Sequence, residues 1–456
     1  MLKLTHCYVL LVGCCLSGCA TYQARELPNK PSLPDTIPHL FVAQQSLSPA
    51  FTHHHEFDPS GALDMDGAAV IAVLNNPDLK LARAEAGVAR AQAFAAGLLP
   101  DPQLSLAGDL SNSGGSGSSK AFSTGLSMDI LALLTYHAND AAAQAEIKKT
   151  DLNLLWQEWQ VAAQARLLYI RITFARKSQA LLALNRALFA TRAGNSQKAY
   201  ANNLISSDAA LPDLSALQDI QKQNSDLERQ INQLLHDFNQ LLGLAPDATV
   251  QLLDSTPPAD LDDAAIIDSI AHLPQRRPDL LALQSGFAAQ DQRYRAALLA
   301  QFPALNIGFT HARDSSGIYS NGLGVTLSLP LFNRNRGNVA IEQTTRDKLI
   351  EDYQLRLDSA NSDIHKILAE QHINARQLDE LQTTLQQFSA LTESADAAYQ
   401  KNIVDALIYT NAHTALLAKQ LEEINLQQAM QEQRVALQTL IGGDLPVQPE
   451  MKKNGS

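Results

Sequence analysis

The chain has 456 residues, a net charge of −12 and aromatic residues at only 5% of its positions. This length exceeds one ordinary globular core, and the acidic balance, without a strongly basic stretch, argues against nucleic acid as a partner. Beyond the N-terminus no run of about 18 apolar residues occurs, which argues against a spanning helix but leaves short spanning strands open.

The first 18 residues have the pattern of a secretory signal peptide, with Lys3 before an apolar run from Tyr8 to Leu16. The run ends in Leu16-Ser17-Gly18-Cys19, which resembles the lipobox of bacterial lipoproteins. We therefore expect Cys19 to carry a covalent lipid, the alternative being ordinary cleavage near a chance cysteine. In such lipoproteins an Asp after the cysteine favours the inner membrane, so Ala20 predicts the outer membrane of a Gram-negative cell.

All four cysteines lie within the first 19 residues, which excludes disulfides and a cysteine-ligated zinc site from the rest of the chain. Residues 19–60 are rich in proline and polar residues and are interpreted as an extended, lipid-anchored tether. They include His53, His54 and His55, but adjacent histidines in a flexible segment do not preorganise a metal site. No metal and no cofactor other than the lipid are expected.

The two halves of the chain are similar at an offset of 201 residues, which becomes 199 farther along. Pro77-Asp78-Leu79 aligns with Pro278-Asp279-Leu280, and Leu242-Gly243 aligns with Ile441-Gly442. A register held over this length indicates a duplicated unit. We predict a first repeat at residues 61–250, a second at 251–445 and a polar tail at 446–456.

Each repeat is predicted to contain a helix, a β-hairpin, a very long helix, a turn and a returning helix. The run from Ala132 to Ala199 has no proline and would extend about 100 Å as a helix. Helices of this length are expected to pack side by side as in coiled coils, and Pro212 is expected to kink the returning helix. The predicted helices are 61–99 (restarting at Pro77), 132–199 and 208–242, then 262–300, 334–401 and 405–441.

The predicted hairpins, at residues 102–131 and 303–332, alternate between apolar and small polar residues. Leu104 and Leu106 alternate with Ser105 and Ala107, for example. Period-2 alternation places the two sets on opposite faces of a sheet, and each segment has the length of about 8–11 residues that a tilted spanning strand needs. The same pattern continues at Phe122, Leu126, Met128, Leu305, Ile307, Phe309, Leu323, Val325, Leu327 and Leu329.

Small polar residues suit the lumen of a barrel, and the apolar face suits lipid, the alternative being two surface hairpins of a soluble protein. Four strands cannot close a wide barrel, and a sheet edge exposed to lipid leaves unpaired backbone groups that cost several kcal/mol each. The chain is therefore expected to pair with copies of itself.

The order and spacing of these features resemble those of the TolC-like outer-membrane efflux proteins over about residues 60–445. The resemblance rests on these segments: Asn76-Pro77-Asp78-Leu79, Arg277-Pro278-Asp279-Leu280, the Leu-Leu-Gly and Leu-Ile-Gly helix ends, and the stretch from Leu327 to Gly337. Within that stretch, residues 331–337 look most like the heavy-metal-efflux branch.

The resemblance implies a mainly α fold with a small β part. Three copies would form an α-helical barrel and a 12-stranded β-barrel, with four strands from each chain. It also implies a periplasmic adaptor protein and an inner-membrane pump as partners, with a passive exit channel as the function.

The family has a periplasmic constriction where helix tips of the second half converge. The stretch from Tyr399 to Ile408 matches its Gly-x-Arg-x-x-Val-Asp-type segment, with Lys401 in the basic position and Asp405 in the first acidic one. Tyr399 stands where glycine is usual and Ile408 replaces a second acid, so one acidic ring is expected rather than two. Asp208 is a further gate candidate. The alternative is a solvated i,i+4 pair of Lys401 with Asp405, worth about 0.2–0.5 kcal/mol.

No nucleotide-binding loop, nucleophile motif or zinc-protease motif occurs, and we do not expect an enzyme. Two other functions are left open. One is a periplasmic coiled-coil structural or adaptor lipoprotein, whose hairpins would be covered by other elements of the chain. The other is the exit duct of a type I secretion system.

Overall fold

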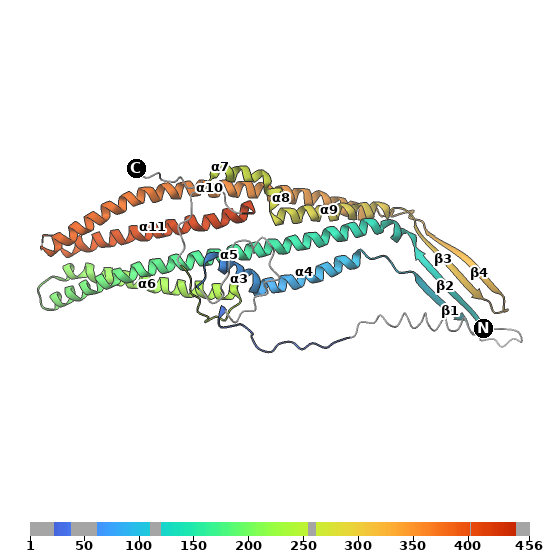
Figure 1. Cartoon of the computed structure of the whole chain (residues 1–456), viewed down its shortest axis with the longest axis horizontal. Coiled ribbons are helices and arrows are strands. Elements are labelled where there is room, and N and C mark those ends of the chain that lie inside the picture. Colours follow the sequence, from blue (N-terminus) through green and yellow to red (C-terminus); the bar gives the residue numbers. More distant parts are fainter. Residues whose placement is uncertain (1–21, 38–61, 110–119, 254–260, 402, 444–456) are drawn as a thin grey trace.

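The computed structural model describes residues 22–37, 62–109, 120–253, 261–401 and 403–443. The signal peptide, Cys19 and His53 to His55 lie outside these ranges. The molecule is elongated, with a β-sheet at one end and the tips of two helical hairpins at the other (Figure 1).

The first half contains α3 and α4, then the strands β1 and β2, then the long helices α5 and α6. The second half contains the short elements α7, η3 and α8, the helix α9, the strands β3 and β4, and the long helices α10 and α11. The bounds are α3 Met65–Asn75, α4 Pro77–Ala96, β1 Gln103–Asp109, β2 Ala121–Asp129, α5 Ile130–Ala201, α6 Ser207–Leu242, α7 Asp263–Ser269, η3 Ile270–His272, α8 Leu273–Arg276, α9 Pro278–Leu299, β3 Ala304–Arg313, β4 Tyr319–Ser328, α10 Arg336–Gln400 and α11 Ala406–Ile441.

The strands form one antiparallel sheet in the order β1-β2-β3-β4, so the two hairpins lie side by side through β2 and β3. The strand β2 leads into α5 without a loop, because the Asp129 carboxylate accepts hydrogen bonds from the backbone N–H groups of Leu131 (2.9 Å) and Ala132 (3.3 Å). This side chain caps the helix at the residue where the strand ends.

In each half, the residue before the helix that leads to the hairpin contacts the end of the returning helix, and the two contacts correspond. The Asn76 amide caps α4 through the N–H of Leu79 (2.9 Å) and donates to the carbonyl oxygen of Leu241 (3.0 Å). In the second half Arg277 occupies the corresponding place and donates to the carbonyl oxygen of Leu440 (3.4 Å). The sequence offsets of 201 and 199 residues therefore correspond to equivalent contacts.

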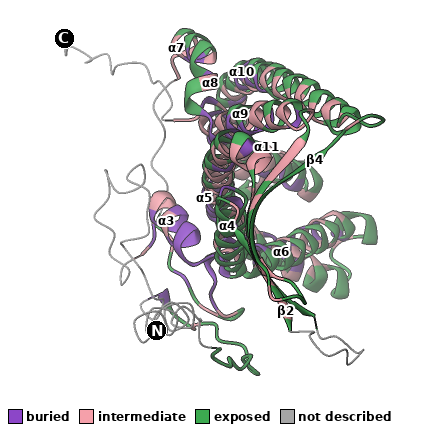
Figure 2. Ribbon diagram, turned by 90° about the vertical axis from the view of Figure 1, so that its right-hand side faces the viewer, coloured by how far each residue is buried: buried purple, intermediate pink, exposed green. Residues whose placement is uncertain are grey.

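The core is distributed along the helices instead of forming one centre. One apolar cluster lies among α3, α5 and α6, a second among α9, α10 and α11, and a third among α5, α6 and α11. Buried residues gather at α3 and within the helical layer, whereas the sheet is largely exposed (Figure 2).

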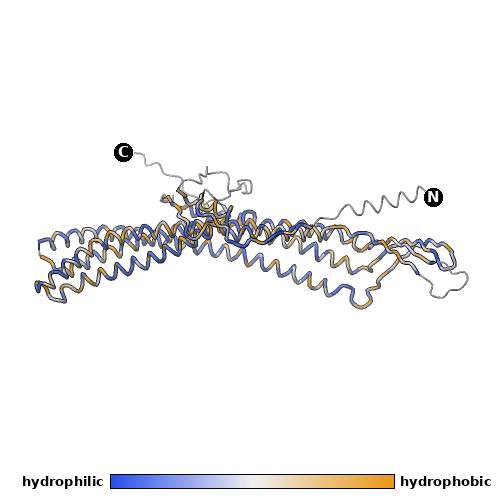
Figure 3. The backbone as a smooth tube through the Cα atoms, turned by 90° about the horizontal axis from the view of Figure 1, so that it is seen from below, coloured by the Kyte–Doolittle hydropathy of each residue, from blue (hydrophilic) through white to orange (hydrophobic). Residues whose placement is uncertain are grey.

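Polar and apolar residues are mixed along the long helices (Figure 3). Among the described residues, no helix combines the length and apolarity needed to cross a membrane.

One predicted helix is wrong. Residues 262–300 do not form a continuous helix but the four pieces from α7 to α9, because Pro274 and Pro278 each lack the N–H that an interior helical position donates. The start of the first helix is also corrected from residue 61 to Met65, where Asp64 caps it through the N–H of Gly67 (2.7 Å). The other predicted helices match to within a few residues, and α6 runs through Pro212.

Candidate functional site: the sheet surface and the helix tips

One face of the sheet carries an apolar row that runs across all four strands. The register places Leu104 opposite Leu126, Leu126 opposite Phe309, and Phe309 opposite Leu323. These side chains are exposed, as Leu323 at 76% illustrates. Leu106, Met128, Leu305, Ile307, Val325 and Leu327 share this face.

The opposite face carries small and polar residues. Ser105 lies opposite Gly125, Gly125 opposite Thr310, and Thr310 opposite Gly322. A sheet with one apolar and one small polar face fits a wall between lipid and water. Both outer strands, β1 and β4, are exposed at every residue and each pairs with a single neighbour.

The three predicted gate residues lie at the tips of the helical hairpins. Lys401 follows α10 directly and is exposed. Asp405 caps α11 by accepting a hydrogen bond from the N–H of Ile408 (2.9 Å). Asp208 is exposed in the first turn of α6. Lys401 and Asp405 flank a turn and make no ion pair with each other, so the solvated i,i+4 pair is not formed.

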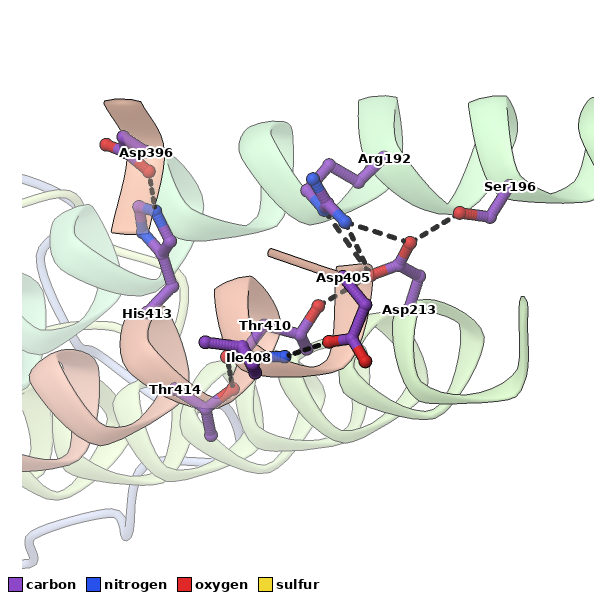
Figure 4. A network of polar contacts seen from close by, with 9 residues as sticks. All are labelled: Arg192, Ser196, Asp213, Asp396, Asp405, Ile408, Thr410, His413 and Thr414. Carbon is purple, nitrogen blue, oxygen red and sulfur yellow. Dashed lines mark hydrogen bonds and ion pairs between the residues drawn. The ribbon is translucent and has the colours of Figure 1, made fainter. Parts of the chain in front are cut away.

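A buried polar network close to these tips was not predicted. Asp213 of α6 is fully buried and accepts hydrogen bonds from Arg192 of α5 (3.2 Å to each carboxylate oxygen) and Thr410 of α11 (2.6 Å). The hydroxyl of Ser196 also donates to it. These four residues, hereafter the Asp213 network, join the two helical hairpins (Figure 4).

Aromatic side chains surround the cation of this network. The Arg192 guanidinium lies 3.9 Å from the ring centroid of Tyr409 and 4.4 Å from that of Tyr399. Burial raises the pKa of the Tyr409 phenol above its ordinary value of 10.0, and the charge of Asp396 acts in the same direction, so Tyr409 is neutral near pH 7. His413 packs against Tyr409 and contacts Asp396 (2.7 Å), as Figure 4 shows for the His413 and Asp396 pair.

The sequence holds two weak signals for this network. Tyr399 replaces the glycine usual in the matching segment, and it lies against Arg192. Asp213 follows a proline within a helix, at a position where a carboxylate is not needed for capping. Neither signal identifies the partners, because Asp213 and Thr410 are 197 residues apart.

Two ion pairs join the halves nearer the middle of the molecule. Glu432 of α11 pairs with Arg171 of α5 (3.0 Å), and Glu146 of α5 pairs with Arg293 of α9 (3.0 Å). Burial alone would raise the pKa of Glu432, but hydrogen bonds from Arg171 and Gln428 outweigh it and hold the pKa below the ordinary value of 4.5.

Within the described ranges, no group of three or more His, Cys, Asp or Glu side chains is placed to hold a metal ion.

Comparison with known proteins gives a consistent result. The family model for outer membrane efflux proteins matches residues 270–443. The chain is 26% identical to the outer membrane protein OprJ of Pseudomonas aeruginosa, across 51% of this chain and 52% of OprJ. It is 24% identical to the probable outer membrane lipoprotein SilC of Salmonella typhimurium, across 37% and 39% of the two chains.

The match to the cation efflux system protein CusC of Escherichia coli K12 is longer, at 25% identity across 82% of this chain and 85% of CusC. A crystal structure of CusC covers 92% of this chain with a TM-score of 0.67 and 19% identity. The matches to OprJ and SilC span only about half and two fifths of those proteins.

Long helical hairpins that carry a small sheet are the fold that the chain shares with the CusC structure. The family match lies in the second half of the chain, at residues 270–443, and the chain as a whole is similar to outer membrane efflux proteins. The predicted fold class is confirmed, and the similarity to outer membrane proteins agrees with the predicted family and location.

Proposed function

We propose that this protein is the outer-membrane exit channel of a tripartite efflux system. The observation that carries the proposal is the sheet, whose apolar face is bare and whose two edge strands each lack one neighbour. Pairing β4 of one copy with β1 of the next satisfies the edges and places the apolar rows toward lipid. Three copies supply twelve strands, and their helices extend the duct into the periplasm.

The transport step is passive in this proposal. The channel lowers the barrier to solute exit, and an inner-membrane pump supplies the energy. The exposed apolar face also counts against the periplasmic adaptor alternative, because that alternative requires other elements to cover the hairpins. The hairpins are instead uncovered, since Leu104 is 65% exposed and Leu106 is 72% exposed.

Cysteine labelling tests the orientation of the sheet, since every native cysteine lies at or before residue 19. The sites of Leu323→Cys and Thr326→Cys lie on the same strand, β4, and belong to opposite faces. In outer-membrane vesicles, a water-soluble maleimide is expected to label Thr326→Cys and spare Leu323→Cys. Strong labelling of Leu323→Cys in a heat-dissociable trimer would contradict the proposed orientation.

The helix tips form the gate in this proposal. Lys401, Asp405 and Asp208 would surround the periplasmic opening, where a ring of Asp405 carboxylates favours cations. The Asp213 network would hold the two hairpins together in the closed arrangement, since it connects α5, α6 and α11 through one buried carboxylate.

A groove between α6 and α11 is the place that we propose for the periplasmic adaptor. It has a volume of about 1080 Å³ and combines apolar side chains such as Leu211 and Leu407 with polar ones such as Asp219. It lies beside the Asp213 network, because Thr410 belongs to both. An adaptor bound there could act on the gate directly.

The proposed cargo is metal cations, on the basis of the long match to CusC and the residue 331–337 segment. A deletion strain should show increased sensitivity and accumulation for heavy-metal ions, with restoration by the plasmid-borne gene. Unchanged metal sensitivity together with increased sensitivity to dyes or antibiotics would redirect the cargo assignment. Loss of secretion of a protein substrate would instead favour the type I duct.

The lipid on Cys19 remains a proposal, supported by the lipobox and by the match to SilC. Metabolic labelling with a fatty acid should mark the native protein and leave Cys19→Ser unlabelled. Labelling of the variant would show that the lipid is elsewhere.

A further inference from the structure

The apolar face of the sheet changes character toward the tips of the hairpins. The rows nearest the helices contain only apolar residues, whereas the next row contains Thr124 opposite His311 and His311 opposite Asn321. The last row contains Phe122 opposite Arg313 and Arg313 opposite Tyr319. Such a change marks the boundary between hydrocarbon and headgroups in a spanning sheet.

The residues of these last rows form one aromatic cluster. The Phe122 ring lies 6.1 Å from that of His311 and 6.3 Å from that of Tyr319, and the His311 and Tyr319 rings stack at 5.9 Å. His311 also contacts the Asn321 amide (2.7 Å). Aromatic side chains with a polar end, such as Tyr319, suit the membrane–water interface, where one side is apolar and the other is wet.

Arg313 is the one guanidinium of this cluster. It lies over the Tyr319 ring at 5.5 Å, and its Nε atom is buried without a hydrogen-bond partner among the described residues. Its guanidinium makes no ion pair within those ranges. A guanidinium has five N–H donors, and leaving them unpaired beside lipid is costly.

In the part of the chain that the structure describes, no acid forms an ion pair with Arg313. One carboxylate oxygen of Asp314 already accepts hydrogen bonds from the N–H groups of Ser316 (2.8 Å) and Ile318 (2.9 Å) in its own turn. Residues 110–119 of the neighbouring hairpin contain no Asp or Glu. A second copy cannot lie directly beside Arg313, because β3 has β2 and β4 of its own chain on its two sides.

A second cation lies close in sequence to the same cluster. Lys120 is exposed and immediately precedes β2, two residues before Phe122. Alternation along the chain gives it the same side as Phe122. Arg313 is eight residues beyond Leu305, about 27 Å along the strand at 3.4 Å per residue, which places it at the edge of the apolar band.

We propose that Arg313, assisted by Lys120, binds the phosphate of a phosphorylated lipid headgroup in the outer leaflet. The inference rests on the proposed lipid-facing orientation of the sheet. The planar fork of Arg313 suits two phosphate oxygens, and the aromatic cluster packs against the adjoining acyl or sugar part of the lipid. The site binds lipid from the membrane side and takes no part in cargo transport.

The test uses the full-length trimer in a neutral detergent. The probes are bisphosphorylated lipid A, the same lipid after enzymatic dephosphorylation, and inorganic phosphate. The readout is the temperature at which the trimer dissociates on a gel, as a function of probe concentration. The variants are Arg313→Gln, Arg313→Lys and Lys120→Gln, and the control is Lys348→Gln, which removes an exposed cation from α10.

Phosphorylated lipid is expected to raise the dissociation temperature of the native protein and of Lys348→Gln. The dephosphorylated lipid and inorganic phosphate are expected to have little effect. The apparent affinity of Arg313→Gln should fall about ten- to a hundredfold, as expected for loss of a charge-assisted hydrogen bond. Arg313→Lys and Lys120→Gln should lose less.

Equal affinities for native protein and Arg313→Gln would overturn the inference, as would equal stabilisation by dephosphorylated lipid or by inorganic phosphate. If Arg313→Gln fails to assemble, the comparison of Arg313→Lys and Lys120→Gln with the control decides the question. Failure of the native chain to form a membrane-inserted trimer would refute the proposed function instead. An inserted trimer that does not discriminate between the lipids refutes only the lipid site.

Discussion

The Asp213 network gives the sharpest test of the proposed gate. Asp213 is fully buried, and the side chain of Arg192 is 10% exposed. Replacing Asp213 with alanine leaves the Arg192 cation buried without its carboxylate, which costs about 3–5 kcal/mol. If this network is formed only in the closed arrangement, the closed-to-open ratio should fall roughly a hundredfold to several thousandfold.

Single-channel conductance of the purified trimer in planar bilayers measures this effect. Asp213→Ala is expected to be open for most of the recording, and the native protein is expected to be mostly closed. The matched control is Asp226→Ala in the same helix, whose carboxylate pairs with Lys222 and Arg229 at the surface. An exposed pair of this kind contributes about 0–1 kcal/mol, so the conductance of the control should stay close to native.

A double variant separates gating from a general loss of stability. Arg192→Met combined with Asp213→Ala removes both charges and should recover part of the closed population, because no buried charge is left unpaired. The reasoning would be refuted if Asp213→Ala formed a folded trimer with native conductance. Simple addition of the two single effects in the double variant would also refute it.

Three further predictions concern stability and insertion. Because the pKa of Glu432 is lowered, its pairing with Arg171 stabilises the protein above about pH 4.5, and this contribution is lost as the pH falls through the folded-state pKa. The free energy of unfolding should therefore depend less steeply on pH in the acid range in Glu432→Gln, as measured by circular dichroism. Gly243→Ala should lower the free energy of unfolding by more than about 1–2 kcal/mol, because Gly243 has φ +71° and a Cβ would lie 2.6 Å from the Asn75 carbonyl oxygen. In Gly337→Ala, the control in the same denaturation assay, the added Cβ meets no atom within 4 Å, so that variant should be neutral or slightly stabilised. Leu323→Arg should reduce assembly into the outer membrane, because an arginine on the lipid-facing side near the bilayer midplane costs about 2–4 kcal/mol. Thr326→Arg, on the other face, should assemble. The measurement for both is the fraction of protein that runs as a heat-dissociable trimer.

The sequence contains enough local information to predict the long elements. The run from Ala132 to Ala199 lacks proline, and the structure extends it to a helix of 72 residues. The alternating strands are equally local signals, because each residue's face follows from its position. The break within residues 262–300 was missed, although Pro274 and Pro278 mark it, since apolar periodicity continues across both prolines.

The network at the tips could not be predicted from local patterns. Arg192 and Asp213 belong to different helices of one hairpin, and Thr410 belongs to the other hairpin. Their juxtaposition depends on how the hairpins pack, which sequence periodicity does not specify. Lys401, Asp405 and Asp208 lie near the tips, in turns that are local features of the sequence, and their role in gating stays a prediction.

The direct passage from β2 into α5 has a mechanical consequence. A helix of 72 residues reaches about 108 Å, so a change of one degree in its direction at the sheet displaces its far end by about 2 Å. Angular fluctuations too small to disturb the sheet would thus alter the width of the proposed opening at the other end by about the diameter of an ion. Rigid attachment alone cannot define that width, and a short-range contact beside the opening is needed to set it.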